Sequence, residues 1–163
     1  MGNRATVIFT DGKRFSPAVY HHWNGGPESI YGFLEELDRR KQRCDQDYEC
    51  ARYIQLVGEF LDQTSVTSTS LGVVNGPKSD SIHDLEKVMT DHSDNGFYLA
   101  NRTVEPMVVR RFKKFYGERD TKFVELSANM VRREREEADK SEYRPKFRAF
   151  FAELTKGKEI EGM

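Results

Sequence analysis

The chain has 163 residues, 37% of them hydrophobic and 12% aromatic, so we expect one folded domain with its own core. Basic and acidic side chains nearly balance at a net charge of −1, which argues against an obligate nucleic-acid binder of strongly basic composition. No apolar run approaches the ~20 residues needed to cross a bilayer, and the start of the sequence lacks a signal-peptide pattern. We therefore expect a cytoplasmic protein without membrane contact.

The first part of the chain predicts a β-hairpin followed by a helix. A β-branched run over 4–10 is followed by the turn residues Asp11 and Gly12 and by an extended stretch over 15–23. Pro27 suits the first turn of a helix. Apolar residues then recur with the helical period of one buried face, and these are Ile30, Phe33, Leu34 and Leu37.

The middle of the chain predicts a second helix, more strands and a short third helix. The second helix begins near Asp47, and Gly58 inside it indicates close packing against a neighbour. Its apolar stripe consists of Cys50, Ile54, Val57 and Leu61, widened by Tyr53 and Phe60. The expected strands are 64–74, 97–100 and 107–112, the last two forming a hairpin, and the short helix is 79–89.

The segment after residue 116 is highly charged, and its apolar spacing predicts helices. Phe123, Leu126 and Met130 form one stripe, and a second stripe, separated from the first by Pro145, consists of Phe147, Phe150, Phe151 and Leu154. The second stripe either closes the chain's own core or pairs with a second copy, so monomer and homodimer both remain open.

Taken together, these patterns predict an α+β fold. We expect an antiparallel sheet of four or five strands, two helices on one face and a C-terminal helical pair. The predicted division is a core domain over 1–116 and a helical extension over 117–163, packed on or beside it.

Charge is spread unevenly along the chain, and the middle is acidic. Residues 45–105 carry 4 basic and 11 acidic side chains. Carboxylates in such a segment would replace nucleic-acid phosphates in a basic protein groove. The candidate protein-binding residues are Asp45, Asp47, Glu49, Asp91 and Asp94, with Tyr98 as an aromatic anchor.

A basic segment supports a second hypothesis, a nucleic-acid-binding accessory protein. Residues 107–133 carry 8 basic and 3 acidic side chains, and the cations alternate with Phe112 and Phe115. Such alternation suits phosphate contacts combined with base stacking. The candidate contacts are Arg110, Arg111, Lys113, Lys114 and Arg119. The opposing interpretation is that the phenylalanines anchor the core and the charges between them are solvated.

The sequence contains no strong catalytic or metal-binding motif, so we expect a non-enzymatic protein without metal or cofactor. Adjacent His21 and His22 point to opposite sides of a strand and cannot hold one ion together. A small hydrolase or transferase built on His22 or on the Glu59–Asp62 pair is the least favoured class. The His22-Trp23-Asn24 turn remains open between a structural and a functional role.

Three strings resemble a small family of uncharacterised bacterial proteins carried by phages and plasmids. The strings are Gly2-Asn3-Arg4-Ala5-Thr6-Val7-Ile8-Phe9, Tyr20-His21-His22-Trp23-Asn24-Gly25-Gly26 and Asp94-Asn95-Gly96-Phe97-Tyr98. The resemblance covers roughly residues 2–110 and implies a mobile genetic element, but it brings no catalytic residues. Small proteins of that setting often resemble inhibitors of host defence, including anti-CRISPR proteins. The resemblance therefore implies a non-enzymatic binding protein that blocks a host protein or ribonucleoprotein.

Overall fold

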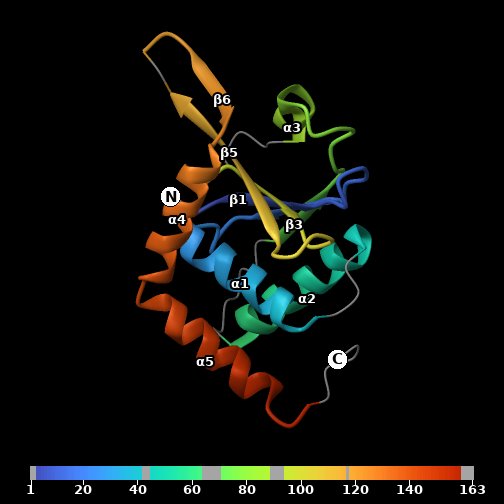
Figure 1. The fold of residues 1–163 in the computed structure, drawn as a ribbon, viewed down its shortest axis with the longest axis vertical. Helices are drawn as coiled ribbons and strands as arrows, with labels where there is room; N and C mark the ends of the chain where they lie inside the picture. Colours follow the sequence, from blue (N-terminus) through green and yellow to red (C-terminus); the bar gives the residue numbers. More distant parts are fainter. Residues whose placement is uncertain (1–2, 42–44, 64–70, 89–93, 117, 159–163) are drawn as a thin grey trace.

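The computed structural model describes residues 3–41, 45–63, 71–88, 94–116 and 118–158. Within them a six-stranded mixed sheet has the order β3-β2-β1-β4-β5-β6, which confirms the α+β class (Figure 1). The strands are β1 (Ala5–Phe9), β2 (Ala18–His21), β3 (Leu71–Val74), β4 (Phe97–Asn101), β5 (Val108–Tyr116) and β6 (Thr121–Glu125). The helices are α1 (Pro27–Arg39), α2 (Gln46–Gln63), α3 (Ile82–Val88), α4 (Ala128–Asp139) and α5 (Tyr143–Thr155).

Both predicted hairpins are present, but the sheet is not wholly antiparallel. β1 pairs with β2, and β4 pairs with β5, in antiparallel registers. β1 and β4 lie side by side in parallel, with Thr6 opposite Phe97. The prediction of four or five antiparallel strands is wrong on this point, because α1, α2, β3 and α3 all lie between β1 and β4 in the chain and no local signal marks that pairing.

A sixth strand occupies part of the segment predicted to be helical. In β6 Phe123 is buried, Val124 is half-buried and the other three residues are exposed. The spacing of Phe123 and Leu126 fits that strand and its exit as well as it fits a helix, which explains the error. Met130, assigned to the same stripe, is 49% exposed.

The main core lies between the sheet and α1, α2, α4 and α5. The predicted stripe of α1 is confirmed, since Ile30, Phe33, Leu34 and Leu37 are at most 1% exposed. Phe33 lies at the centre of an aromatic cluster, with ring centroids 5.4 Å from Phe60 and 5.2 Å from Phe147. The C-terminal stripe thus closes the chain's own core. Pro145 does not separate two helices but lies in the first turn of α5, where its missing N–H has no helical partner to lose.

The opposite face of the sheet is covered by α3, which lies above the sheet in Figure 1 while α1, α2 and α5 lie below it. Leu85 of α3 is buried in a second cluster with Ile8, Phe97 and Phe112. A Cβ added at Gly58 of α2 would meet no other group within 4 Å, so the close packing expected there is absent. The described part of the expected third strand is limited to Leu71–Val74, and residues 64–70 lie outside the described residues.

The C-terminal helices are tied to the rest of the fold by ion pairs as well as by packing. Glu134 of α4 binds Arg111 of β5, and Arg144 of α5 binds Glu35 of α1. The predicted division at residue 116 stays a prediction. None of the described helices combines the length and the apolar character needed to span a bilayer.

Candidate nucleic-acid interface

β5 and β6 form a ribbon that projects past the rest of the sheet, at the top of Figure 1. β4 pairs with β5 from Val108 to Phe112, whereas β6 pairs with β5 from Phe112 to Tyr116. The far half of the ribbon, residues 113–116 and 121–124, is therefore held by one ladder only. We call these residues the distal ribbon.

The distal ribbon carries an exposed aromatic ring and a lysine on each of its two faces, and of the lysines Lys122 is exposed and Lys114 half-buried. Phe115 is 48% and Tyr116 is 77% exposed. Phe115 lies directly opposite Lys122, and the alternation of the strand places Lys114 and Tyr116 together on the other face. Arg119 is exposed between the two strands. Lys122 belongs to the predicted basic segment over 110–122 but was not singled out as a contact, and Tyr116 was not predicted.

The structure buries Arg111, so its prediction as a nucleic-acid contact is wrong. Its side chain has no solvent exposure, its Nε lies 2.6 Å from Glu134 Oε1, and its Nη1 donates to the Phe97 carbonyl at 2.6 Å. Lys113 lies 3.0 Å from the other oxygen of Glu134. Both cations therefore stabilise the junction between α4 and the sheet.

Arg110 is half-exposed but already bound by two carboxylates. Its Nε lies 2.6 Å from Glu125 and its Nη1 lies 2.7 Å from Asp80. These hydrogen bonds, Glu125 first, raise the pKa of Arg110. Of the predicted basic contacts, Lys114 and Arg119 are the two that the structure leaves unpaired among the described residues.

Two members of the predicted acidic face are buried, which corrects their assignment as contacts. Tyr98 has no exposed surface and cannot anchor a partner. Glu49 is 1% exposed, and its Oε1 lies 3.4 Å from Nη2 of Arg102. Both side chains are buried because each faces the main core, Tyr98 from β4 and Glu49 from α2. Asp91 lies outside the described residues.

The remaining acidic candidates do not share one face. Asp94 is exposed one residue before Asn95, whose backbone N–H donates to Arg4 at the start of β1. Asp45 and exposed Asp47 lie at the start of α2, beside the opposite end of β4, where Arg102 meets Glu49. The length of β4 therefore separates Asp94 from the other two.

Glu49 is a buried carboxyl group with a strongly perturbed pKa. Burial raises its pKa to about 7, although the neighbouring Arg102 and Arg52 act in the opposite direction. Its carboxylate oxygens have no hydrogen-bond partner. A hollow of about 240 Å³ opens beside it, and its lining residues are Asp38, Lys41, Arg102, Val104 and Glu105. Perturbed carboxylates often mark active sites, but no cluster of metal-ligating side chains lies among the described residues.

Of the polar residues that the sequence singled out, His21 and Glu59 have structural partners. His21 Nε2 lies 2.9 Å from the Tyr53 hydroxyl, and burial lowers the pKa of His21 to about 4, which keeps the ring neutral. Glu59 accepts from Arg40 at 2.8 Å. The side chain of Asp62 lies outside the described residues. Burial also raises the pKa of the Cys50 thiol, which disfavours a reactive thiolate.

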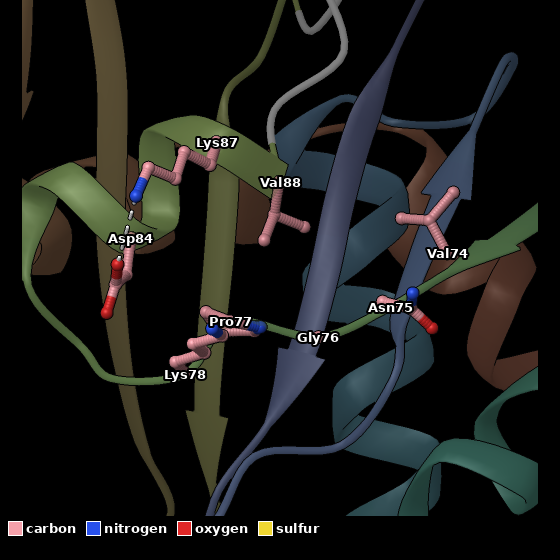
Figure 2. A pocket seen from close by; sticks show the side chains of 8 residues that line it. All are labelled: Val74, Asn75, Gly76, Pro77, Lys78, Asp84, Lys87 and Val88. Atoms are coloured by element: carbon pink, nitrogen blue, oxygen red, sulfur yellow. Dashed lines mark ion pairs between the residues drawn. The ribbon is translucent and has the colours of Figure 1, made fainter.

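A hollow of about 490 Å³ lies between α3 and the strand end at Val74 (Figure 2). Figure 2 shows Asp84 and Lys87 directed toward each other on α3, 3.8 Å apart, with Gly76 across the hollow. The pair neutralises itself, so the hollow presents no uncompensated charge from α3.

Comparisons with protein-family models, with curated proteins and with solved structures give no match. The resemblance to proteins of phages and plasmids therefore stays a prediction.

Proposed function

We propose that this chain is a non-enzymatic nucleic-acid-binding protein and that the distal ribbon is its main contact element. The observation that carries the proposal is the exposure of Phe115 and Tyr116 beside Lys114 and Lys122 on a two-stranded ribbon that projects from the sheet. A folded chain gains nothing for its own core from two adjacent exposed rings at such a place.

The chemistry of the distal ribbon suits a polyanion that also carries aromatic bases. The ammonium groups of Lys114 and Lys122 and the guanidinium of Arg119 supply phosphate contacts. The rings of Phe115 and Tyr116 supply stacking surfaces that accept any base. Glu118 and Asp120 near the tip reduce the positive charge, so we expect moderate affinity with a strong dependence on stacking.

A blocking protein with an acidic face, the form implied by the mobile-element resemblance, ranks second. Its aromatic anchor Tyr98 and its carboxylate Glu49 are buried, and Asp94 lies apart from Asp45 and Asp47. An inhibitor of a host ribonucleoprotein that uses the distal ribbon instead is compatible with nucleic-acid binding.

The test is fluorescence anisotropy with labelled oligonucleotides. A length of about 20 nucleotides exceeds the site sizes of known single-strand-binding folds. We expect binding at about 50 mM salt that weakens with added salt by a slope of about −0.7 for each phosphate contacted. The variant Phe115→Ala/Tyr116→Ala should lose about ten- to a hundredfold in affinity. Absence of binding to every single-stranded and duplex probe at low salt would refute the proposal.

α5 offers a control, because it lies away from the distal ribbon in Figure 1 and carries an exposed aromatic–cation pair. Tyr143 is 51% exposed, and Lys146 Nζ lies 5.4 Å from its ring centroid. The variant Tyr143→Ala/Lys146→Ala removes one exposed ring and one ammonium group, where the ribbon variant removes two rings, and should leave the affinity unchanged. An equal loss in both double variants would show non-specific binding rather than a ribbon site.

A further inference from the structure

A row of four polar residues lies at one end of β2, β1, β4 and β5. Ala5 pairs with His21, and Arg4 and His22 are the next residues beyond that pair. On the other side of β1 the backbone N–H of Asn95 donates to the Arg4 carbonyl at 2.9 Å. The ladder between β4 and β5 ends at the pair of Phe97 and Phe112. Asn95 lies in the turn before Gly96, and its side-chain amide donates to the Arg4 carbonyl. Lys114 lies two residues past Phe112 on β5. The row, from β2 to β5, is His22, Arg4, Asn95 and Lys114.

Arg4 supplies this row with an uncompensated positive charge. Its Nε is buried and has no hydrogen-bond partner, and no carboxylate of the described residues forms an ion pair with it. Arg110, Arg111 and Arg144 each bind carboxylates. A buried guanidinium nitrogen without a partner is costly, and Arg4 as a whole is half-buried, so part of the residue remains open to a phosphate.

Three aromatic rings flank the β2 end of the row. The Tyr20 and His22 rings lie 6.4 Å apart, and the His22 and Trp23 rings meet edge to face at 5.2 Å. Trp23 is 44% exposed. Asn24 follows with a positive φ of 57°, which turns the chain sharply after the tryptophan. At the other end of the row, Tyr116 stands on the same face as Lys114, two residues along β5.

We propose that a single-stranded nucleic acid runs from the distal ribbon along this row to Trp23. Arg4 and Lys114 bind its phosphates, and Tyr116 and Trp23 stack on its bases. This inference rests on the proposed function and adds both the second contact and the kind of strand. Stacking on exposed rings requires unpaired bases, so a single strand is the ligand.

The dimensions of the row agree with that path. Three strand spacings separate β2 from β5, a span of about 14–15 Å. The row and the distal ribbon together fit the site sizes of about 4–16 nucleotides seen on single-strand-binding folds. Asp94 lies beside the row and opposes phosphate binding there, so Arg4 must supply most of the attraction at the centre.

The single tryptophan of the chain gives a direct readout. We expect Trp23 emission to fall when a thymidine oligonucleotide of about 20 nucleotides is added, in parallel with the anisotropy change. A duplex of the same length should bind more weakly and leave the emission unchanged. Binding without any change in Trp23 emission would overturn this inference and leave the proposed function standing, whereas no binding would overturn both.

Variants at the row supply the second measurement. Arg4→Ala and Trp23→Ala should each weaken binding of the long oligonucleotide at least about fivefold, and Trp23→Phe should restore most of the loss. Affinity for a short oligonucleotide of about 4 nucleotides, which the distal ribbon alone accommodates, should change little. Equal losses for short and long probes, or none for either, would contradict a path along the row. Circular dichroism of each variant checks that the fold is retained.

Discussion

The guanidinium carbon of Arg111 lies 3.5 Å from the centroid of the Tyr98 ring, at a place where neither side chain meets solvent. The charge is balanced by Glu134 of α4 and by the Phe97 carbonyl. A buried cation is tolerated only when its partners are in place. α4 is therefore coupled to the sheet through one carboxylate.

The two partners of this ion pair should differ in their effect on stability. Glu134→Ala leaves a fully buried arginine without its carboxylate, and we expect a loss of about 3–5 kcal/mol in the free energy of unfolding. Arg111→Met should cost less, because Glu134 keeps Lys113 and the Tyr31 hydroxyl as partners. Urea unfolding at neutral pH measures both. Glu136→Ala, on the exposed side of α4, is the control and should change stability by less than about 0.5 kcal/mol; similar losses in all three variants would contradict the coupling.

Two buried groups should give stability opposite dependences on pH. Folding raises the pKa of Glu49 to about 7 because burial disfavours the carboxylate. The folded state then binds more protons than the unfolded state, so this contribution to stability falls as the pH rises from about 4.5 to 7. Folding lowers the pKa of His21 to about 4 through burial. The unfolded state then binds the extra proton, so this contribution rises with pH from about 4 to 6.5.

The contributions of Glu49 and His21 to stability change in opposite directions between about pH 5 and 6.5. We therefore expect the melting temperature of the unaltered protein to vary little with pH in that window. Glu49→Gln should make the melting temperature rise with pH over this window, and His21→Gln should make it fall. Thermal unfolding in a series of buffers measures the three profiles. Parallel profiles in all three proteins would show that neither group titrates as described.

Replacing Gly58 and Gly25 by alanine should change the stability of the fold in opposite directions. A Cβ at Gly58, inside α2, meets nothing within 4 Å, so Gly58→Ala should stabilise the helix by up to about 1 kcal/mol. A Cβ at Gly25 would lie 2.6 Å from both the Ala5 nitrogen and the Asn3 oxygen, so Gly25→Ala must displace the start of β1 and destabilise the fold. Melting temperatures measure both, and a stabilising Gly25→Ala would contradict the tight approach.

The aromatic cluster should hold α5 in place. The Phe147 ring stacks on Phe60 at 4.6 Å and is 5% exposed, so Phe147→Ala should cost about 3–5 kcal/mol. Limited proteolysis should then cleave α5 faster than the rest of the chain. Tyr143→Ala, on the exposed side of the same helix, should leave the cleavage rate unchanged. Uniform cleavage along the whole Phe147→Ala chain would instead indicate that α5 and the sheet unfold as one unit.

A fragment of residues 1–116 tests the predicted domain boundary. The truncation removes β6 and Glu134, which exposes Phe112 and leaves Arg111 without its carboxylate, so we expect a fragment without cooperative unfolding. A fragment with a sigmoidal urea transition would show that 1–116 is an independent domain. The same fragment extended to residue 158 is the control.

The sequence by itself determined the local elements of this protein. The hairpin of β1 and β2, the buried face of α1 and the stripe of α5 follow from periodicity and turn residues, which act over a few positions. The parallel pairing of β1 with β4 and the burial of Tyr98, Glu49 and Arg111 were decided by the tertiary structure. A charged residue in a strand has the same sequence pattern whether it faces solvent or a partner such as Glu134. Whether Arg111 faces solvent or a carboxylate depends on Glu134, a residue of α4 that lies more than twenty positions further along the chain. No local spacing of residues carries that information.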